Sequence, residues 1–189
     1  MSGDLNHQGT DKLRRGRVSI PGARYFTTFW TQGRELGLSR PEVAEVLIEE
    51  LRGLHCSSDI HLFSATIMPE HVHVLFELGR RLSLAQVHAK YKFKTRGLLA
   101  AAGLGWQGNY FDHRLREQVP MEQFARYIYL NPYRKQLLSV DAVWPYWVLH
   151  RPYTPEFVQH LIGGVTPPLE WLKSGSCASE LVEADYRLC

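Results

Sequence analysis

The residues best suited to chemistry are two histidines separated by a single valine, His71 and His73. If residues 71–76 form a β-strand, both imidazoles point to the same side, because successive side chains of a strand alternate between its faces. The apolar residues of the run then point to the other side, as core residues would. Histidine is the commonest metal ligand, so the pattern predicts half of a divalent-metal site, although each histidine alone could equally be a surface or core residue.

Two imidazoles do not complete a catalytic metal site, which takes a third protein ligand and keeps an open position. Glu77 is on the same strand face, but the rise of ~3.3 Å per residue places it about 13 Å beyond His73, too far for a ligand. Tyr127 and Asn131 are four residues apart and would share a helix face, so they could bring a phenol and an amide oxygen to the metal. Tyr127 could instead be a core residue, and Asn131 with Pro132 could cap a new helical turn.

The elements that must position these residues follow from periodicity and from capping signals. Ser39 with Glu42, and Ser83 with Gln86, have the spacing of capping boxes, each just before a run of apolar residues at helical spacing. Runs of β-branched and aromatic residues indicate the strands. The predicted strands are residues 24–32, 59–67, 71–78 and 109–117. The first predicted helix follows the Ser39–Glu42 signal and ends near Gly53, the second covers residues 84–102, and the third covers residues 121–131 and ends where Pro132 interferes.

This order, β-α-β-β-α-β, predicts a ferredoxin-like α+β fold with an antiparallel sheet. Right-handed crossovers place strands 24–32 and 71–78 in the middle of the sheet and strands 59–67 and 109–117 at its edges. Both crossover helices then cover the same face. His71 and His73 must lie on the opposite face, and the helix over residues 121–131 is the first element available to cover it.

Three segments are expected along the chain. Residues 1–22 are polar and basic, and we expect a flexible arm in which Arg14 and Arg15 contact phosphate, unless it is merely a solvated tail. Residues 23–140 form the folded domain. Residues 141–189 are expected to form an irregular C-terminal extension that packs on this domain. Its last part could instead be a mobile tail. The aromatic cluster of residues 144–147 is expected to pack against the core.

Composition sets broad limits on function. The chain is 44% hydrophobic and 22% charged, with a net charge of +3, which is typical of a globular domain and permits a nucleic-acid partner. Three scattered cysteines, Cys56, Cys177 and Cys189, give neither a disulfide framework nor a metal-binding spacing. No apolar run reaches the ~20 residues of a membrane span, and the first residues are polar. We therefore expect a cytoplasmic, nucleoid-associated protein without a membrane partner.

Basic side chains interleaved with aromatic ones suit single-stranded nucleic acid, because phosphates follow the charges and bases stack on the rings. Some of the lysines in such a pattern are expected to be ordinary surface residues, and Arg114 and Arg116 could simply pair with Asp112 and Glu117. The candidate DNA-contacting residues are Lys90, Lys92, Lys94, Arg96, Arg114, Arg116, Arg14 and Arg15.

Two motifs, MPEHVHVLF at residues 68–76 and YIYLNPYR at residues 127–134, resemble those of the single-tyrosine HUH transposases, and more narrowly the REP-associated tyrosine transposases. The resemblance covers roughly residues 20–140. It implies that His71 and His73 bind Mg²⁺ or Mn²⁺ and that Tyr127 is the nucleophile. Asn131 stands where related transposases have a glutamine ligand. Tyr129 projects about 200° around the helix from Tyr127, so both cannot face the metal.

The resemblance also implies a reaction and a partner. The expected protein is a metal-dependent endonuclease and strand transferase that acts on single-stranded DNA with a palindromic hairpin, through a 5′-phosphotyrosine intermediate, as a monomer or homodimer. One alternative is a domesticated, non-catalytic binder of hairpin DNA or RNA that acts as a regulator. Another is a metal hydrolase that uses bound water and forms no covalent adduct.

Overall fold

The computed structural model of the protein describes residues 19–173 and 178–187. Most of the predicted basic arm, including Arg14 and Arg15, therefore lies outside the described residues, as do Cys177 and Cys189. Within the described part, no helix is long and apolar enough to cross a membrane.

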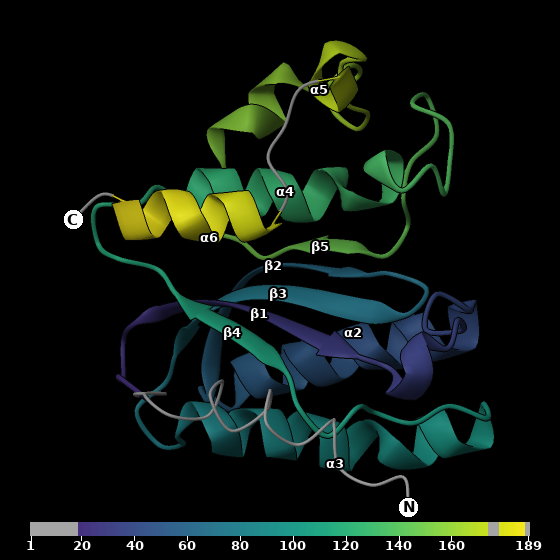
Figure 1. The fold of residues 1–189 in the computed structure, drawn as a ribbon, viewed down its shortest axis with the longest axis vertical. Coiled ribbons are helices and arrows are strands. Elements are labelled where there is room, and N and C mark those ends of the chain that lie inside the picture. The colour runs from purple at the N-terminus through teal and green to yellow at the C-terminus, as the bar shows by residue number, and fades with distance from the viewer. Residues whose placement is uncertain (1–18, 174–177, 188–189) are drawn as a thin grey trace, which may run out of the picture.

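Regular elements follow the predicted order and then continue into the C-terminal extension (Figure 1). The strands are β1 (Arg24–Trp30), β2 (Ile60–Ile67), β3 (His71–Leu78), β4 (Phe111–Arg114) and β5 (Trp147–Leu149). The helices are α2 (Pro41–Cys56), α3 (Leu84–Ala101), α4 (Met121–Arg134), α5 (Glu170–Lys173) and α6 (Ala178–Arg187), with short 3-10 helices η1 (Gln32–Arg34) and η2 (Glu156–His160).

The strands form one antiparallel sheet in the order β4-β1-β3-β2-β5. The central positions of β1 and β3 are confirmed. The prediction that the strand over residues 59–67 lies at an edge is wrong, because β5 from the C-terminal extension pairs with β2 through Ser64–Thr66. The extension is thus partly regular, and it widens the sheet by one strand.

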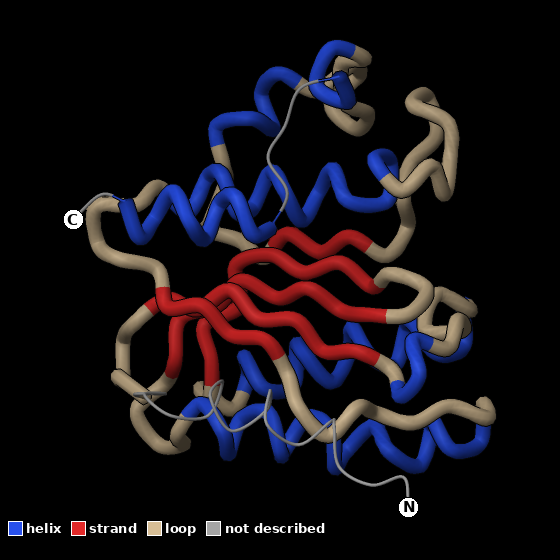
Figure 2. Tube along the Cα trace, viewed as in Figure 1, coloured by secondary structure: helices blue, strands red, loops and turns tan. Residues whose placement is uncertain are grey.

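Helices cover both faces of the sheet (Figure 2). Helices α2 and α3 lie on one face and enclose the core that contains Val72, Val74 and Phe76 of β3. Helix α4 and the C-terminal extension lie on the other face, over a second core around Phe26 and Leu75. This is the arrangement expected for His71 and His73, whose side of β3 faces α4. Tyr146 and Trp147 of the predicted aromatic cluster pack against these two cores.

The two predicted capping boxes have different outcomes. Ser83 and Gln86 form a complete capping box at the start of α3. The box predicted from Ser39 and Glu42 is wrong: α2 begins at Pro41, after an N-cap residue that makes no side-chain bond. Proline is favoured in the first turn because its fixed φ suits a helix and the missing N–H would be unpaired there anyway. Helix α2 also continues three residues past Gly53, to Cys56.

Helix α4 does not end at Asn131 as predicted but continues through Pro132 to Arg134. A proline inside a helix removes one backbone hydrogen bond, and the buried packing of α4 on the sheet compensates for it. The interpretation of Asn131 as the cap of a new turn is therefore wrong. Strand β4 is also shorter than predicted, with four residues instead of nine.

Candidate metal centre and nucleophile

His71 and His73 lie side by side on β3 with their side chains turned to the α4 face. They are 6% and 4% exposed, and their Nε2 atoms are 3.0 Å apart. Two neighbouring ligand atoms of an octahedral ion with bonds of about 2.1 Å are about 3.0 Å apart. The pair can therefore bind one divalent cation through both Nε2 atoms without rearrangement of the strand.

The other nitrogen of each imidazole has its own partner. The hydroxyl of Thr28 on β1 lies 2.8 Å from His73 Nδ1, and Glu70 Oε1 lies 3.0 Å from His71 Nδ1. Such contacts hold metal-binding imidazoles in position and leave the opposite nitrogen for the ion. Thr28 is placed by strand register, since it pairs directly with His73. Neither Thr28 nor Glu70 was predicted from the sequence, and the Thr28 contact depends on strand pairing across 45 residues.

The surroundings of the pair favour a neutral His73 and an ionised Glu70. Burial, followed by the charges of His71 and Lys135, lowers the pKa of His73 well below its usual value. The hydrogen bond with His71 lowers the pKa of Glu70, although partial burial opposes this effect. Neutral imidazole is the form in which histidine binds a metal, so the surroundings of His73 favour its binding form.

Helix α4 brings Tyr127 to the histidine pair. The Tyr127 hydroxyl is 3.5 Å from His73 Nε2, and the two rings meet edge to face at 5.3 Å. Phe26 of β1 contacts both rings and so fixes their relative position. Arg134, two turns further along α4, interacts electrostatically with Tyr127. The arrangement therefore places a phenol directly beside the two candidate ligands and within electrostatic reach of Arg134.

The other two tyrosines of α4 point elsewhere. Tyr129 donates a hydrogen bond to the Val165 carbonyl, and Tyr133 donates one to the Ala142 carbonyl. Burial raises the pKa of the Tyr129 hydroxyl well above its usual value. Both hydroxyls thus stabilise the contact between α4 and the C-terminal extension. Tyr129 points away from the histidine pair, as its expected separation of about 200° from Tyr127 around the helix requires.

Asn131 lies one turn after Tyr127 on α4 and is 3% exposed. Because it is four residues after Tyr127, its side chain shares the Tyr127 face of α4, and its amide oxygen is the candidate third ligand. Among the described residues no group of three or more His, Cys, Asp or Glu side chains is placed to bind a metal.

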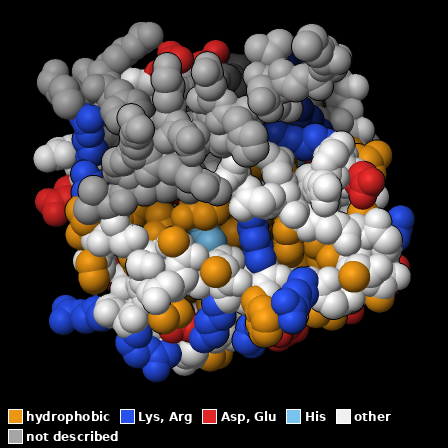
Figure 3. Space-filling model, turned by 60° about the horizontal axis from the view of Figure 1, so that its bottom comes forward, with side chains coloured by type: hydrophobic (Ala, Val, Ile, Leu, Met, Phe, Trp, Pro, Cys, Tyr) orange, Lys and Arg blue, Asp and Glu red, His pale blue; other side chains and the backbone are white. Residues whose placement is uncertain are grey.

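The basic residues predicted on α3 lie on the opposite face of the sheet from the histidine pair and have partners within the protein. Lys90 pairs with Asp59, and Lys94 pairs with Glu50 at 2.8 Å. Lys92 donates to backbone carbonyls of residues 107–109, and Arg96 lies over the Phe93 ring. Lys and Arg side chains are scattered over the face in Figure 3 and do not gather in one patch.

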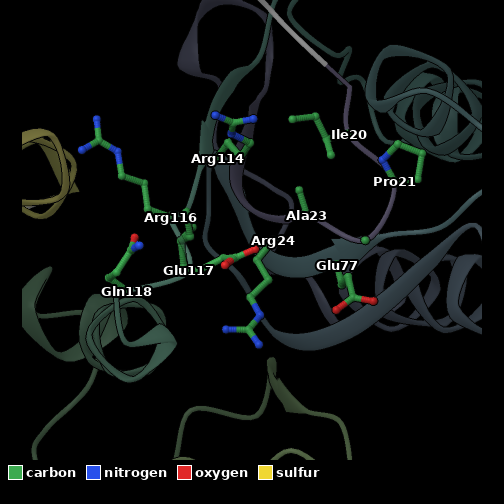
Figure 4. Close-up of a pocket in the computed structure, with 11 residues that line it drawn as sticks. Ile20, Pro21, Ala23, Arg24, Glu77, Arg114, Arg116, Glu117 and Gln118 are labelled. Atoms are coloured by element: carbon green, nitrogen blue, oxygen red, sulfur yellow. The ribbon is translucent and has the colours of Figure 1, made fainter. Parts of the chain in front are cut away.

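Arg114 and Arg116 lie at the end of the sheet distant from His71, beside a cavity of about 740 Å³. Arg24 from the start of β1 and Glu77 from the end of β3 also line it. The arginine side chains point in different directions around this cavity (Figure 4). The structure thus separates the predicted basic residues into three places: outside the described residues, on α3, and at this end of the sheet.

Comparison with known proteins supports the predicted resemblance. The sequence is 26% identical over 113 residues to a Haemophilus influenzae protein named "Putative REP-associated tyrosine transposase", with 52% of this chain and 64% of the relative covered. The chain therefore spans less than two thirds of that relative's length. No family model matches the sequence. The similarity confirms that the chain resembles the REP-associated tyrosine transposases, as its two motifs predicted.

Two solved structures resemble the fold. One is a REP-associated tyrosine transposase bound to a REP hairpin, which superimposes with a TM-score of 0.60 at 20% identity and covers 71% of this chain and 81% of its own. The other is a putative transposase from Deinococcus radiodurans R1, with a TM-score of 0.45, 20% identity, and coverage of 65% and 95%. The first similarity confirms the ferredoxin-like α+β fold.

Proposed function

We propose that this chain, which resembles the REP-associated tyrosine transposases in sequence and in fold, cleaves and rejoins single-stranded DNA beside a hairpin with Tyr127 as nucleophile. The observation that carries the proposal is the position of the Tyr127 hydroxyl, 3.5 Å from Nε2 of His73 and next to a pair of imidazoles suited to one cation. The hairpin is proposed because the structural relative with a TM-score of 0.60 is bound to a REP hairpin.

His71 and His73 would hold the cation through their Nε2 atoms, and the amide oxygen of Asn131 is the candidate third ligand. Bound Mg²⁺ or Mn²⁺ would polarise the scissile phosphate and stabilise the charge that develops on it. The protein's own contribution is to keep both imidazoles oriented. Thr28 and Glu70 do this through the Nδ1 atoms.

Tyr127 then carries the covalent step. Its oxygen attacks phosphorus while the bond from phosphorus to the 3′-oxygen breaks, and the phenolic proton is balanced by the proton that the 3′-hydroxyl gains. The products are a 5′-phosphotyrosine and a free 3′-hydroxyl. Because the ester keeps the energy of the broken bond, another 3′-hydroxyl can reverse the reaction without ATP. Arg134 supports the step by attracting the ionised phenol.

The test is formation of a covalent adduct. Labelled hairpin-bearing single strands are incubated with the protein and Mn²⁺, and adducts that survive SDS are counted. We expect an adduct for the unmodified protein and none for Tyr127→Phe, with DNA affinity unchanged. The matched control is Tyr133→Phe, which removes the hydroxyl of a tyrosine six residues along the same helix that donates to Ala142.

The outcomes separate the functions considered. An adduct that persists in Tyr127→Phe would refute Tyr127 as the nucleophile. Cleavage without any adduct in the unmodified protein would favour a hydrolase that uses bound water. Hairpin binding with neither cleavage nor adduct, with or without Mn²⁺, would favour a non-catalytic binder.

A further inference from the structure

One buried hydroxyl beside the histidine pair is not used by the fold. Thr66 of β2 is 0% exposed, and its Oγ1 atom has no hydrogen-bond partner among the described residues. Such a hydroxyl destabilises the folded protein, because it has lost its bonds to water and gained none in return. A native protein keeps a group of this kind where an ion, a ligand or another functional state supplies the partner.

The side chain of Thr66 lies on the same sheet face as the histidine pair. Its neighbours along β2, Ala65 and Ile67, belong to the core beneath α2 and α3, so the side chain between them points to the face that α4 covers. Strand register agrees, since Thr66 pairs directly with His73, and directly paired residues of antiparallel strands share a face. Thr66 is therefore next to a candidate metal ligand, in the layer between the sheet and α4.

The other hydroxyls around His73 already have partners. Thr28 flanks His73 from the β1 side and lies 2.8 Å from its Nδ1 atom. Ser64, two residues before Thr66 on the same face of β2, accepts a hydrogen bond of 3.1 Å from the Trp147 indole. Of the two threonines that flank His73, only Thr66 has an unused hydroxyl among the described residues.

Helix α4 brings Asn131 to the same region. Tyr127 contacts His73 on β3. Lys135, the residue that caps the end of α4, acts electrostatically on Glu70, which comes just before β3. The helix therefore runs along β3 in the opposite direction. Asn131, four residues after Tyr127, is ~6 Å further along α4 and so reaches the level of the first histidine of the pair.

The side chain of Asn131 and that of Thr66 border one space from opposite sides. Helical side chains tilt toward the N-terminus of their helix, so the Asn131 amide lies between the levels of the two histidines. Helix α4 packs on β2 as well as on β3, and neighbouring strands are only ~4.8 Å apart. Asn131 thus approaches this space from α4, and Thr66 approaches it from the sheet.

An amide that binds a cation has a second group to satisfy. Its oxygen is the ligand, and its NH₂ group carries two donors that need acceptors when the residue is buried. Asn131 is 3% exposed, so water has little access to these donors. A threonine hydroxyl can accept a hydrogen bond through its lone pairs. Outer contacts of this kind orient a metal ligand and raise the affinity for the metal.

We propose that Thr66 is a positioning residue of the metal centre. When a divalent cation binds the histidine pair, the Thr66 hydroxyl accepts a hydrogen bond from the Asn131 amide and turns the amide oxygen toward the cation. This inference rests on the proposed function, to which the cation belongs. It assigns a purpose to a hydroxyl that only weakens the metal-free fold, and it explains how asparagine can serve as the third ligand.

The experiment measures Mn²⁺ affinity by titration calorimetry and stability by urea denaturation without metal. Thr66→Val removes the hydroxyl and keeps the branched shape, whereas Thr66→Ser keeps the hydroxyl and removes the methyl group. The matched control is Thr27→Val. Thr27 is equally buried and its hydroxyl also has no partner among the described residues, but it pairs with Val74 on the face that α2 and α3 cover.

The two Thr66 variants should change stability and metal affinity in opposite directions. Thr66→Val should keep or raise the urea midpoint, because an unpaired hydroxyl is lost, and should weaken Mn²⁺ binding about 10- to 100-fold. Thr66→Ser should lower the urea midpoint, because a buried methyl group is lost, and should keep most of the Mn²⁺ affinity. Thr27→Val should keep or raise the midpoint and leave the Mn²⁺ affinity unchanged.

A double-mutant cycle tests the connection between Thr66 and Asn131. Asn131→Ala should itself weaken Mn²⁺ binding. Addition of Thr66→Val should then cause little further loss, because a hydroxyl that acts through the amide has no amide left to orient. Independent losses that add in the double variant would overturn the connection, and so would an Asn131→Ala variant that binds Mn²⁺ as tightly as the unmodified protein.

Three other results would overturn the inference: an unchanged Mn²⁺ affinity in Thr66→Val, a similar loss of affinity in Thr27→Val, or no Mn²⁺ binding by the unmodified protein. Parallel losses of stability and affinity in both Thr66 variants would show a purely structural role. The proposed function is judged separately, by the Tyr127 adduct at saturating Mn²⁺. The expected Mn²⁺ pattern without an adduct would leave the role of Thr66 intact and remove only the covalent mechanism.

Discussion

Replacement of Thr28 by valine tests whether the histidine pair is a metal site. The Thr28 hydroxyl lies 2.8 Å from His73 Nδ1 in a buried position, and valine has nearly the same shape and the same preference for strands. Loss of such an outer contact typically lowers metal affinity about 10- to 100-fold, which is about 1.4–2.8 kcal/mol. This range overlaps the cost of about 1–3 kcal/mol for leaving a buried polar atom unpaired.

The adjacent residue provides a matched control. Thr27 is as buried as Thr28 but points to the opposite face of β1, and its hydroxyl has no partner among the described residues. Thr27→Val should therefore leave stability unchanged or slightly increased. Mn²⁺ affinity is measured by titration calorimetry, and the free energy of unfolding is measured by urea denaturation without metal.

The expected result is a fall in Mn²⁺ affinity for Thr28→Val alone. If Thr28→Val binds Mn²⁺ as tightly as the unmodified protein, the proposed role of Thr28 in orienting His73 is refuted. If both variants bind Mn²⁺ more weakly to a similar extent, any substitution within β1 disturbs the histidine pair, and the Thr28 hydroxyl has no particular role. Absence of Mn²⁺ binding in the unmodified protein would refute the metal site itself.

Two further predictions concern stability. Asp59→Asn should lower the free energy of unfolding by about 1–3 kcal/mol at neutral pH, because it removes a buried, hydrogen-bonded charge from its cationic partners. Burial alone would raise the pKa of Asp59, but its hydrogen bonds, led by the one from Lys90, lower it overall. A group with a lowered folded-state pKa stabilises the fold above its unfolded pKa of about 4, so the difference from the unmodified protein should shrink as the pH falls below about 4. The control is Glu45→Gln on the exposed side of α2, which should leave the free energy of unfolding nearly unchanged. Urea denaturation at several pH values measures both variants. Tyr129→Phe should lower the free energy of unfolding by about 0.5–1.5 kcal/mol through loss of its bond to Val165 and should leave adduct formation intact, and a lost adduct would contradict the geometry of α4.

The fold was largely predictable because its signals are local. Strand alternation placed the two histidines on one face, and handedness of the crossovers placed that face away from α2 and α3. Strand β5 was missed because three residues in an aromatic segment carry no detectable alternation. Helix α4 was predicted too short because Pro132 is a strong local signal, and packing against the sheet overrides it.

The candidate site was only half predictable. The spacing of His71 with His73, and of Tyr127 with Asn131, is visible in the sequence because each pair lies within one element. Thr28 is visible only once β1 and β3 are paired in register. The ion pairs of Lys90 and Lys94 also depend on tertiary contacts, so a lysine-rich helix looked like a DNA surface although these lysines have partners in the protein.

The short outer strands have a consequence for association between molecules. An exposed strand edge offers unpaired N–H and C=O groups to which another chain can add, the first step of edge-to-edge aggregation. The inner strands have seven or eight residues, but β4 has four and β5 has three. Without β5, the eight-residue β2 would form an edge. The sheet tapers on both sides, which leaves little template for intermolecular pairing and should help to keep the protein dispersed at high concentration.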